Sequence, residues 1–172
     1  MEAVSSPAAD VEEPPELPGE LAALLDGSDL DRRVGLTIEL LTVDPEGWPG
    51  VALLSVGEVV ALDGSTLRLA LWPGTRTTAN LTRSGQGVLA LVHDGAAYTL
   101  RLMTRRGGDL ADPERAVFDG RLASARRDEV PYARLRSGIT FDLPDADTVV
   151  ARWRSTVEKL RSHPGCEPEG AG

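Results

Sequence analysis

The chain has 172 residues, of which 41% are hydrophobic, and this is enough for one compact domain with a buried core. Its formal charge of −9 at pH 7 disfavours nonspecific binding to nucleic acid or to anionic lipid, because both of those surfaces are negative. Cys166 is the single cysteine, so no internal disulfide can form. We therefore expect the protein in a reducing cytoplasm.

Composition also suggests how the chain is divided. Residues 1–16 are rich in Ala, Pro, Asp and Glu and lack both a basic start and an apolar run, which is typical of a disordered acidic tail rather than a signal peptide. No apolar stretch reaches the length of about 18 residues that a transmembrane helix needs. We expect one folded domain over residues 17–162 and a second disordered tail over residues 163–172.

The first predicted elements are a short helix and two strands. Residues 17–25 have helical apolar spacing, with Pro18 in the first turn and Asp26-Gly27-Ser28 as the stop. Residues 34–43 and 51–56 are predicted strands, and apolar residues occupy both faces of the second. Burial on two faces is typical of the wall of a small closed barrel that is covered outside by a helix or by a partner subunit.

Two Asp-Gly turns, at Asp63-Gly64 and Asp94-Gly95, predict β-hairpins and hence a largely antiparallel sheet. The strands that flank them are residues 59–62 with 66–71 and residues 88–92 with 97–102.

The remaining predicted elements complete a core of six or seven strands. Residues 75–83 are predicted to form a helix, and residues 116–125 alternate as a strand. Another helix is predicted at residues 128–136, followed by a short strand at residues 139–141. Residues 145–162 predict an amphipathic helix, whose apolar stripe is expected to pack on the barrel.

A candidate anion site lies in residues 69–81, where an alternating strand passes through a Pro-Gly break into a helix rich in hydroxyls. The first amides of a helix lack partners within it, and the helix dipole favours an anion there. Thr75, Thr77 and Thr78 add hydroxyls, and Arg76 adds a planar fork that can grip phosphate oxygens. The alternative is that Thr75 only caps the helix and Arg76 is a solvated surface charge.

Groups that could carry catalysis alone are scarce. Only His93 and His163 are present, and no Cys, His or carboxylate spacing resembles a zinc site, so no metal is expected. His93 lies at a predicted hairpin end, and no serine has a nucleophile-elbow sequence around it. No catalytic residue is identified. If the protein is an enzyme, we expect a cofactor to supply the reactive group.

Two segments resemble the pyridoxamine 5′-phosphate oxidase-like family of FMN-binding split-barrel proteins. They are Asp44-Pro-Glu-Gly-Trp-Pro49 before the strand at residues 51–56, and Trp72-Pro-Gly-Thr-Arg-Thr-Thr-Ala-Asn-Leu81. The resemblance covers roughly residues 21–160. It implies a mainly β (α+β) fold: a six-stranded antiparallel split β-barrel with flanking helices and a C-terminal amphipathic helix. It also implies a homodimer with two flavins in grooves at the subunit interface.

The same resemblance implies the roles of particular residues. Thr75 and Arg76 match the hydroxyl and the arginine that hold the flavin phosphate, and Asn80 lies one helical turn beyond. Trp72 and Ser55 are expected to border the flavin ring or its ribityl chain; the alternatives are a barrel-rim aromatic and a locally bonded hydroxyl. The expected cofactor-binding residues are thus Thr75, Arg76, Thr77, Thr78, Asn80, Trp72 and Ser55.

The leading functional hypothesis is a homodimeric, FMN-dependent oxidoreductase with a small-molecule electron donor or acceptor. The deazaflavin F420 is a secondary cofactor candidate, because the scarcity of lysine makes its polyanionic tail harder to accommodate. A second hypothesis is a non-catalytic sensor, carrier or assembly module with weak or lost flavin binding, motivated by basic residues of the family that are missing here. Arg105-Arg106 and Arg126-Arg127 are isolated pairs without interleaved aromatics, so no nucleic-acid partner is expected.

Overall fold

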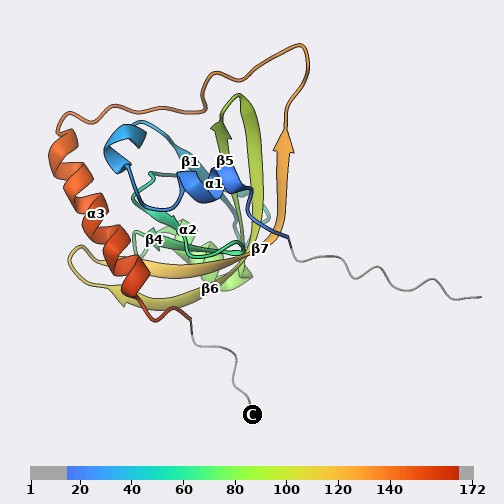
Figure 1. Ribbon diagram of the computed structural model, residues 1–172. Helices are drawn as coiled ribbons and strands as arrows, with labels where there is room; N and C mark the ends of the chain where they lie inside the picture. The colour runs from blue at the N-terminus through green and yellow to red at the C-terminus, as the bar shows by residue number, and fades with distance from the viewer. Residues whose placement is uncertain (1–14, 167–172) are drawn as a thin grey trace, which may run out of the picture.

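The computed structural model describes residues 15–166, which form one curved antiparallel sheet flanked by helices (Figure 1). The expected acidic tail therefore lies almost wholly outside the described residues, as do residues 167–172. The helices are α1 (Gly19–Leu24), the 3-10 helix η1 (Leu30–Arg33), α2 (Arg76–Ser84) and α3 (Ala146–Ser162). The strands are β1 (Ile38–Val43), β2 (Pro49–Leu54), β3 (Val59–Ala61), β4 (Thr66–Leu71), β5 (Gln86–His93), β6 (Ala96–Leu110) and β7 (Arg115–Asp128).

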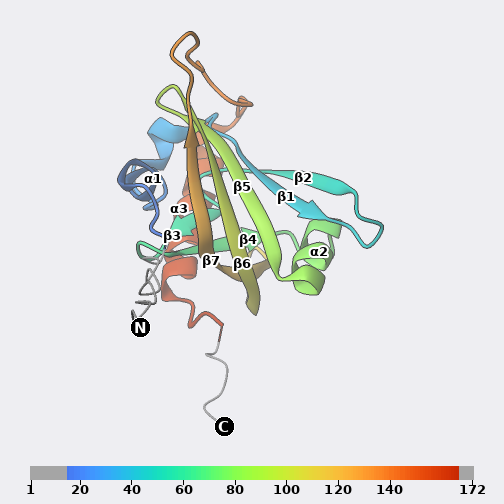
Figure 2. The same ribbon diagram turned by 90° about the vertical axis from the view of Figure 1, so that its right-hand side faces the viewer.

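The described sheet has seven strands in the order β2-β1-β5-β6-β7-β4-β3, which is within the six or seven expected from the sequence pattern but differs from the six-stranded barrel that the family resemblance implies. β6 and β7 have 15 and 14 residues and pair along most of their length, with register shifts at Arg101/Leu102 and Arg106/Asp109. Such irregularities bend strands. These two long strands therefore join the β1-β2-β5 half to the β3-β4 half and give a half-barrel. Figure 2 shows β5, β6 and β7 side by side, with α2 near β1 and β2 and α1 on the opposite side.

The prediction of a helix at residues 128–136 and of a strand at residues 139–141 is wrong. This segment forms turns, with only the isolated bridges Val130↔Ala133 and Leu36↔Thr140. All side chains from 129 to 140 are exposed, so the segment has no buried apolar face to stabilise a helix. Pro131, which lacks an N–H, also interrupts the segment.

Two apolar clusters lie on opposite faces of the sheet. One fills the concave side and includes Ile38, Leu40, Leu69 and Phe118, with α1 closing it. The other lies between α3 and the opposite face of β3, β4 and β7. Its α3 members follow the predicted stripe: Val150, Trp153, Val157 and Leu160.

Gly57 permits a close approach between α3 and the turn that follows β2. A Cβ atom at this position would lie 2.1 Å from Cγ of Trp153, a separation that atoms do not tolerate. The turn between β2 and β3 therefore packs directly on the indole of α3, and any larger residue at position 57 would push the helix away.

A buried ion pair fixes the C-terminal end of α3. Nε of Arg68, on β4, lies 2.5 Å from Oδ1 of Asp119, on β7. Nη1 of Arg68 donates to the carbonyl oxygens of Leu160 and His163, at 2.8 and 2.6 Å. The N–H of Cys166 donates to Oδ2 of Asp119 at 2.9 Å. Residues 163–166, at the start of the predicted C-terminal tail, thus pack against β7.

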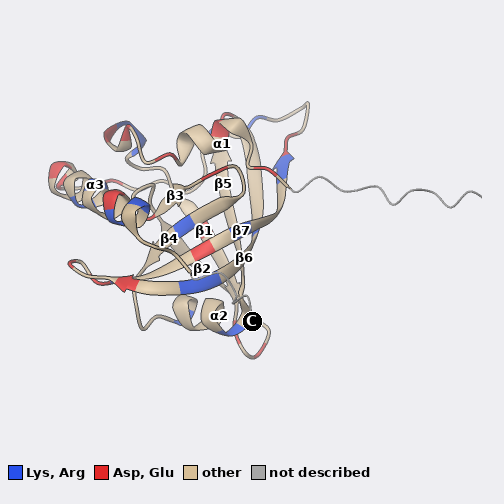
Figure 3. Ribbon diagram, turned by 60° about the horizontal axis from the view of Figure 1, so that its bottom comes forward, with Lys and Arg blue, Asp and Glu red and all other residues tan. Residues whose placement is uncertain are grey.

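Charged residues are distributed over the whole molecule. Figure 3 shows basic and acidic positions interspersed along the helices and strands. Among the described residues, no helix combines the length and the apolar character needed to cross a bilayer.

Replacing Arg68 by Ala tests the ion pair, because it leaves the partly buried Asp119 without its cation and removes both donors to the end of α3. Removing one partner of a buried pair typically costs about 3 kcal/mol, so we expect the free energy of unfolding in urea to fall by that amount. The matched control is Arg126→Ala, which breaks an exposed pair with Asp128 and should cost less than about 1 kcal/mol. Equal losses in the two variants would contradict the anchoring role.

Asp119 also predicts a dependence of stability on pH. Burial favours the neutral form, but hydrogen bonds from Arg68 and from the N–H of Cys166, with the charge of Arg68, outweigh it and lower the pKa of Asp119. The depressed pKa stabilises the fold above the unfolded value of about 3.9, and this contribution is lost as the pH falls through the folded value. We expect unfolding free energies measured from about pH 6 to pH 2 to fall less steeply in Asp119→Asn than in the wild type. Parallel curves would contradict this prediction.

Candidate functional site

The start of α2 is a well-formed helix cap. Thr75 is the N-cap residue in extended conformation, and its Oγ1 accepts a hydrogen bond from the N–H of Thr78 at 3.2 Å. The hydroxyl of Thr78 in turn donates to the carbonyl oxygen of Thr75 at 2.8 Å. Two of the predicted phosphate hydroxyls are therefore engaged in the cap. Such a cap is worth roughly 1 kcal/mol of helix stability.

The groups at this end that remain available to a ligand are Arg76 and Thr77. Arg76 is exposed, and its guanidinium makes no hydrogen bond or ion pair with residues 15–166. Thr77 is half-buried beside it. The first amides of the helix add partial positive charge at the same place. An anion could thus be held by Arg76 and the backbone, with less help from the threonine hydroxyls than the sequence suggests.

Asn80 points away from this end. It is buried, and its Nδ2 donates to Oγ1 of Thr42, on β1, at 3.1 Å. The side chain therefore joins α2 to the sheet, and the structure does not bring it together with Arg76.

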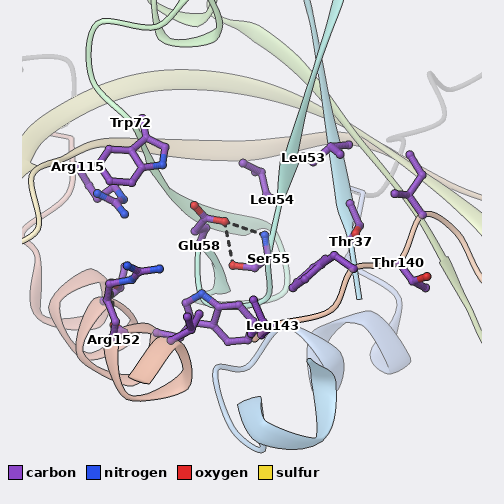
Figure 4. Close-up of a pocket in the computed structure, with 15 residues that line it drawn as sticks. Thr37, Leu53, Leu54, Ser55, Glu58, Trp72, Arg115, Thr140, Leu143 and Arg152 are labelled. Atoms are coloured by element: carbon purple, nitrogen blue, oxygen red, sulfur yellow. Dashed lines mark hydrogen bonds between the residues drawn. The ribbon is translucent and has the colours of Figure 1, made fainter. Parts of the chain in front are cut away.

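Trp72 and Ser55, the other two predicted residues, both line a cavity of about 360 Å³ (Figure 4). The cavity lies between the end of β2, the start of β7, α3 and the segment that precedes α3. Trp72 also borders the start of α2, because its carbonyl oxygen accepts a hydrogen bond from the Thr75 hydroxyl at 3.2 Å. Trp72 therefore lines the cavity and also bonds to the N-cap residue of α2, whereas no residue of α2 itself lines the cavity.

Arg115 is the most unusual group in the cavity. Its guanidinium carbon lies 3.4 Å from the centre of the Trp72 ring, in a cation–π stack, and the residue is only 4% exposed. Nη1 donates to the carbonyl oxygen of Glu114 at 2.8 Å, but the buried Nε has no hydrogen-bond partner among the described residues. A buried guanidinium donor without an acceptor is costly.

The electrostatics of the cavity are set by Arg115, Arg152 and Glu58. Burial lowers the pKa of Arg115 from its usual value; the Glu58 carboxylate opposes this effect, and the charge of Arg152 adds to it. Oε2 of Glu58 accepts hydrogen bonds from the N–H and the hydroxyl of Ser55, at 2.8 and 2.9 Å. The described side chains thus give the cavity two cations and one carboxylate that is already hydrogen-bonded.

Sequence reasoning missed Arg115, Arg152, Glu58 and Thr37, which also line the cavity. The one local signal was a charged residue, Arg115, at the head of the apolar run 116–118. Its significance depends on Trp72 and α3, which are distant in the sequence. In residues 15–166, no group of three or more His, Cys, Asp or Glu side chains is arranged to hold a metal.

Comparison with known proteins agrees with this architecture. A crystal structure of HupZ from Group A Streptococcus superposes with a TM-score of 0.52 and 15% identity, covering 73% of this chain and 99% of HupZ. A candidate pyridoxamine 5′-phosphate oxidase from Lactobacillus delbrueckii gives a TM-score of 0.51 and 20% identity, covering 64% and 93% of the two chains. The half-barrel is therefore consistent with the split-barrel fold.

Sequence similarity then defines the family. The model described as "Protein of unknown function (DUF447) N-terminal domain" matches residues 55–134. The uncharacterized protein YclD of Bacillus subtilis (strain 168) is 38% identical over 143 residues, which are 82% of this chain and 93% of YclD. The chain belongs to the same family as YclD.

Proposed function

We propose that the chain is a flavin-dependent oxidoreductase of the pyridoxamine 5′-phosphate oxidase-like kind, which binds FMN and works as a homodimer. The observation that supports this proposal is the position of Trp72, which lines the cavity and whose carbonyl oxygen accepts a hydrogen bond from the N-cap residue of α2. An anion site and a ring-sized cavity that adjoin in this way match the two ends of a flavin mononucleotide. The fold shared with the Lactobacillus protein allows such a site but does not assign it.

The phosphate end of the proposed site is Arg76 with the first amides of α2. Arg76 is free to form a bidentate contact, and its charge on the helix terminus reinforces the helix dipole. Trp72 and Thr75 are three residues apart, so the chain between them spans at most about 11 Å. A ribityl phosphate chain can bridge a separation of this size.

The ring end of the proposed site is the cavity wall formed by Trp72 and Ser55. Its volume of about 360 Å³ is at the lower end of the roughly 300–1,000 Å³ that is typical of ligand pockets. When bound, FMN supplies hydride or electron transfer. The chain contributes orientation through Trp72 and exclusion of water through its apolar walls, among them Leu53 and Leu54.

An exposed apolar sheet face supports the homodimer. Val51 and Leu53, on the edge strand β2, are 57% and 56% exposed. Val51 pairs with Leu41, which pairs with Val88 on β5, so apolar residues continue across three strands. A hollow of about 410 Å³ opens beside them, with Met103 on its wall. A contiguous apolar face of this kind marks an interaction surface, and a second copy presenting the same face would cover it symmetrically.

A second candidate, the non-catalytic module with weak flavin binding, is favoured by one observation. The hydroxyls of Thr75 and Thr78 are engaged in the helix cap, so Arg76 would carry most of the phosphate contact. Each charge-assisted hydrogen bond that is absent weakens binding by roughly tenfold or more.

Titration with FMN tests the cofactor proposal. We expect saturable quenching of flavin fluorescence, and absorption near 450 nm, roughly the usual flavin band, in the complex. Arg76→Ala should weaken binding by about 10- to 100-fold, because it removes the cationic phosphate contact. The matched control is Arg83→Ala at the other end of α2, where the side chain contacts the carbonyl oxygen of Val43. Equal dissociation constants for wild type and Arg76→Ala would remove Arg76 from the site.

Sedimentation velocity tests the dimer. We expect the wild type to sediment as a dimer and Val51→Asp as a monomer, because a charge in the centre of an apolar interface is left desolvated and unpaired. Val130→Asp is the matched control: Val130 is 44% exposed, lies outside this sheet face, and should leave the dimer intact. A monomeric wild type at all concentrations would refute the dimer without affecting the FMN titration.

A further inference from the structure

Arg115 and Arg152 give one end of the cavity a chemistry that the flavin proposal does not use. Figure 4 shows both side chains on the same side of the cavity, Arg115 next to Trp72 and Arg152 below them on α3, with Thr37 and Thr140 on the other side. Neither arginine forms an ion pair with residues 15–166. We propose that this cavity binds a small oxyanion, a carboxylate or a phosphate monoester attached to an apolar body, with Arg115 and Arg152 as its cationic ligands. This proposal does not depend on flavin binding.

Burial is the first argument. Arg115 is 4% exposed, and its Nε is buried without an acceptor among the described residues. A guanidinium keeps its proton under ordinary conditions, so Arg115 remains charged although it is buried. A ligand oxyanion in the cavity is the partner that would balance this charge.

Charge balance is the second argument. The chain as a whole has a formal charge of −9, yet two guanidiniums share this cavity with one carboxylate, Glu58. Oε2 of Glu58 already accepts two hydrogen bonds from Ser55. The two positive charges in the cavity repel each other, and an anion bound between them would attract both.

The stack on Trp72 is the third argument. The indole holds the Arg115 guanidinium by one face, at 3.4 Å, and this fixes the orientation of the guanidinium plane in the cavity. A guanidinium fixed in this way loses little rotamer freedom on binding, and its planar fork suits the paired oxygens of a carboxylate or phosphate.

The walls define the rest of the ligand. Leu54, Phe141 and Leu143 provide apolar surface between the two ends. At the far end, the cavity is lined by Thr37 and Thr140. The ligand class is therefore a small molecule with an anionic group at one end, an apolar and preferably flat body, and room for a polar substituent at the other end.

Benzoate, benzamide and benzamidine have the same ring and differ in charge. Comparing them therefore tests the effect of charge on binding at nearly constant shape. We expect calorimetric titration to give saturable binding of benzoate, at least about tenfold weaker binding of the neutral amide, and no binding of the cation. Phenyl phosphate distinguishes the two anion sources, because its affinity relative to benzoate shows which group the arginines prefer. No saturable binding of either anion would overturn the proposal, as would equal affinities for benzoate and benzamide.

Variants then assign the binding to the two arginines. Arg115→Gln and Arg152→Gln should each weaken benzoate binding by about tenfold. Arg152 is exposed, so its variant keeps the test valid if Arg115→Gln fails to fold. Arg154→Gln is the matched control, on the same helix with the same change of charge, but its side chain approaches Asp31 instead. If Arg154→Gln weakens binding as much as Arg152→Gln, the effect is general electrostatics and the proposal is wrong.

Both proposals place a ring in the same cavity beside Trp72, so we expect benzoate and FMN to compete. The exposed Arg152 separates the two proposals: Arg152→Gln should weaken benzoate binding and leave the dissociation constant of FMN unchanged, whereas an equal loss of both affinities overturns the oxyanion proposal by assigning this arginine to the flavin. If the protein binds benzoate through Arg115 but does not bind FMN, the oxyanion site stands and the flavin proposal fails.

Discussion

The buried ion pair between Arg68 and Asp119 is the contact on which the position of α3 depends. Arg68 pairs with Asp119, which lies directly opposite on the neighbouring strand β7, and it also donates to the carbonyl oxygens at the end of α3. The apolar stripe of the helix sets which face meets the sheet, but apolar contacts are not directional and allow sliding. The directional contacts of Arg68 fix the helix along its axis. They therefore determine where Arg152 and Trp153, roughly two to three turns earlier, meet the cavity.

The cavity is formed jointly by several elements, and no single element encloses it. Gly57 lets the turn after β2 approach Trp153, and this brings Ser55 and Glu58 beneath α3. Arg115, at the head of β7, reaches the same space by stacking on Trp72, which follows β4. The cavity thus depends on the half-barrel bringing β2, β4 and β7 to one side, where α3 crosses.

Local signals predicted much of this fold, and nonlocal contacts account for what they missed. The two Asp-Gly hairpins, α2 and α3 follow from turn chemistry and apolar period, which act over a few residues. The helix expected at residues 128–136 is absent because its apolar residues have nothing to pack against. In the candidate site, the sequence already offered helix capping as the alternative role of Thr75. It gave no indication that Asn80 would contact Thr42. Arg115 could not be singled out, because its role arises from a distant tryptophan and helix.

The net charge of the chain and its anion-binding groups act over different distances. The charge of −9 repels anions at long range, although salt screens this repulsion beyond roughly 8 Å at physiological ionic strength. Around the exposed Arg76, water weakens any attraction, whereas the buried Arg115 acts in a lower dielectric and attracts more strongly. A ligand for the cavity is therefore not steered in by charge. It needs an apolar body that gains from burial against Leu54 and Leu143, and the arginines then select among such bodies for those that end in an oxyanion.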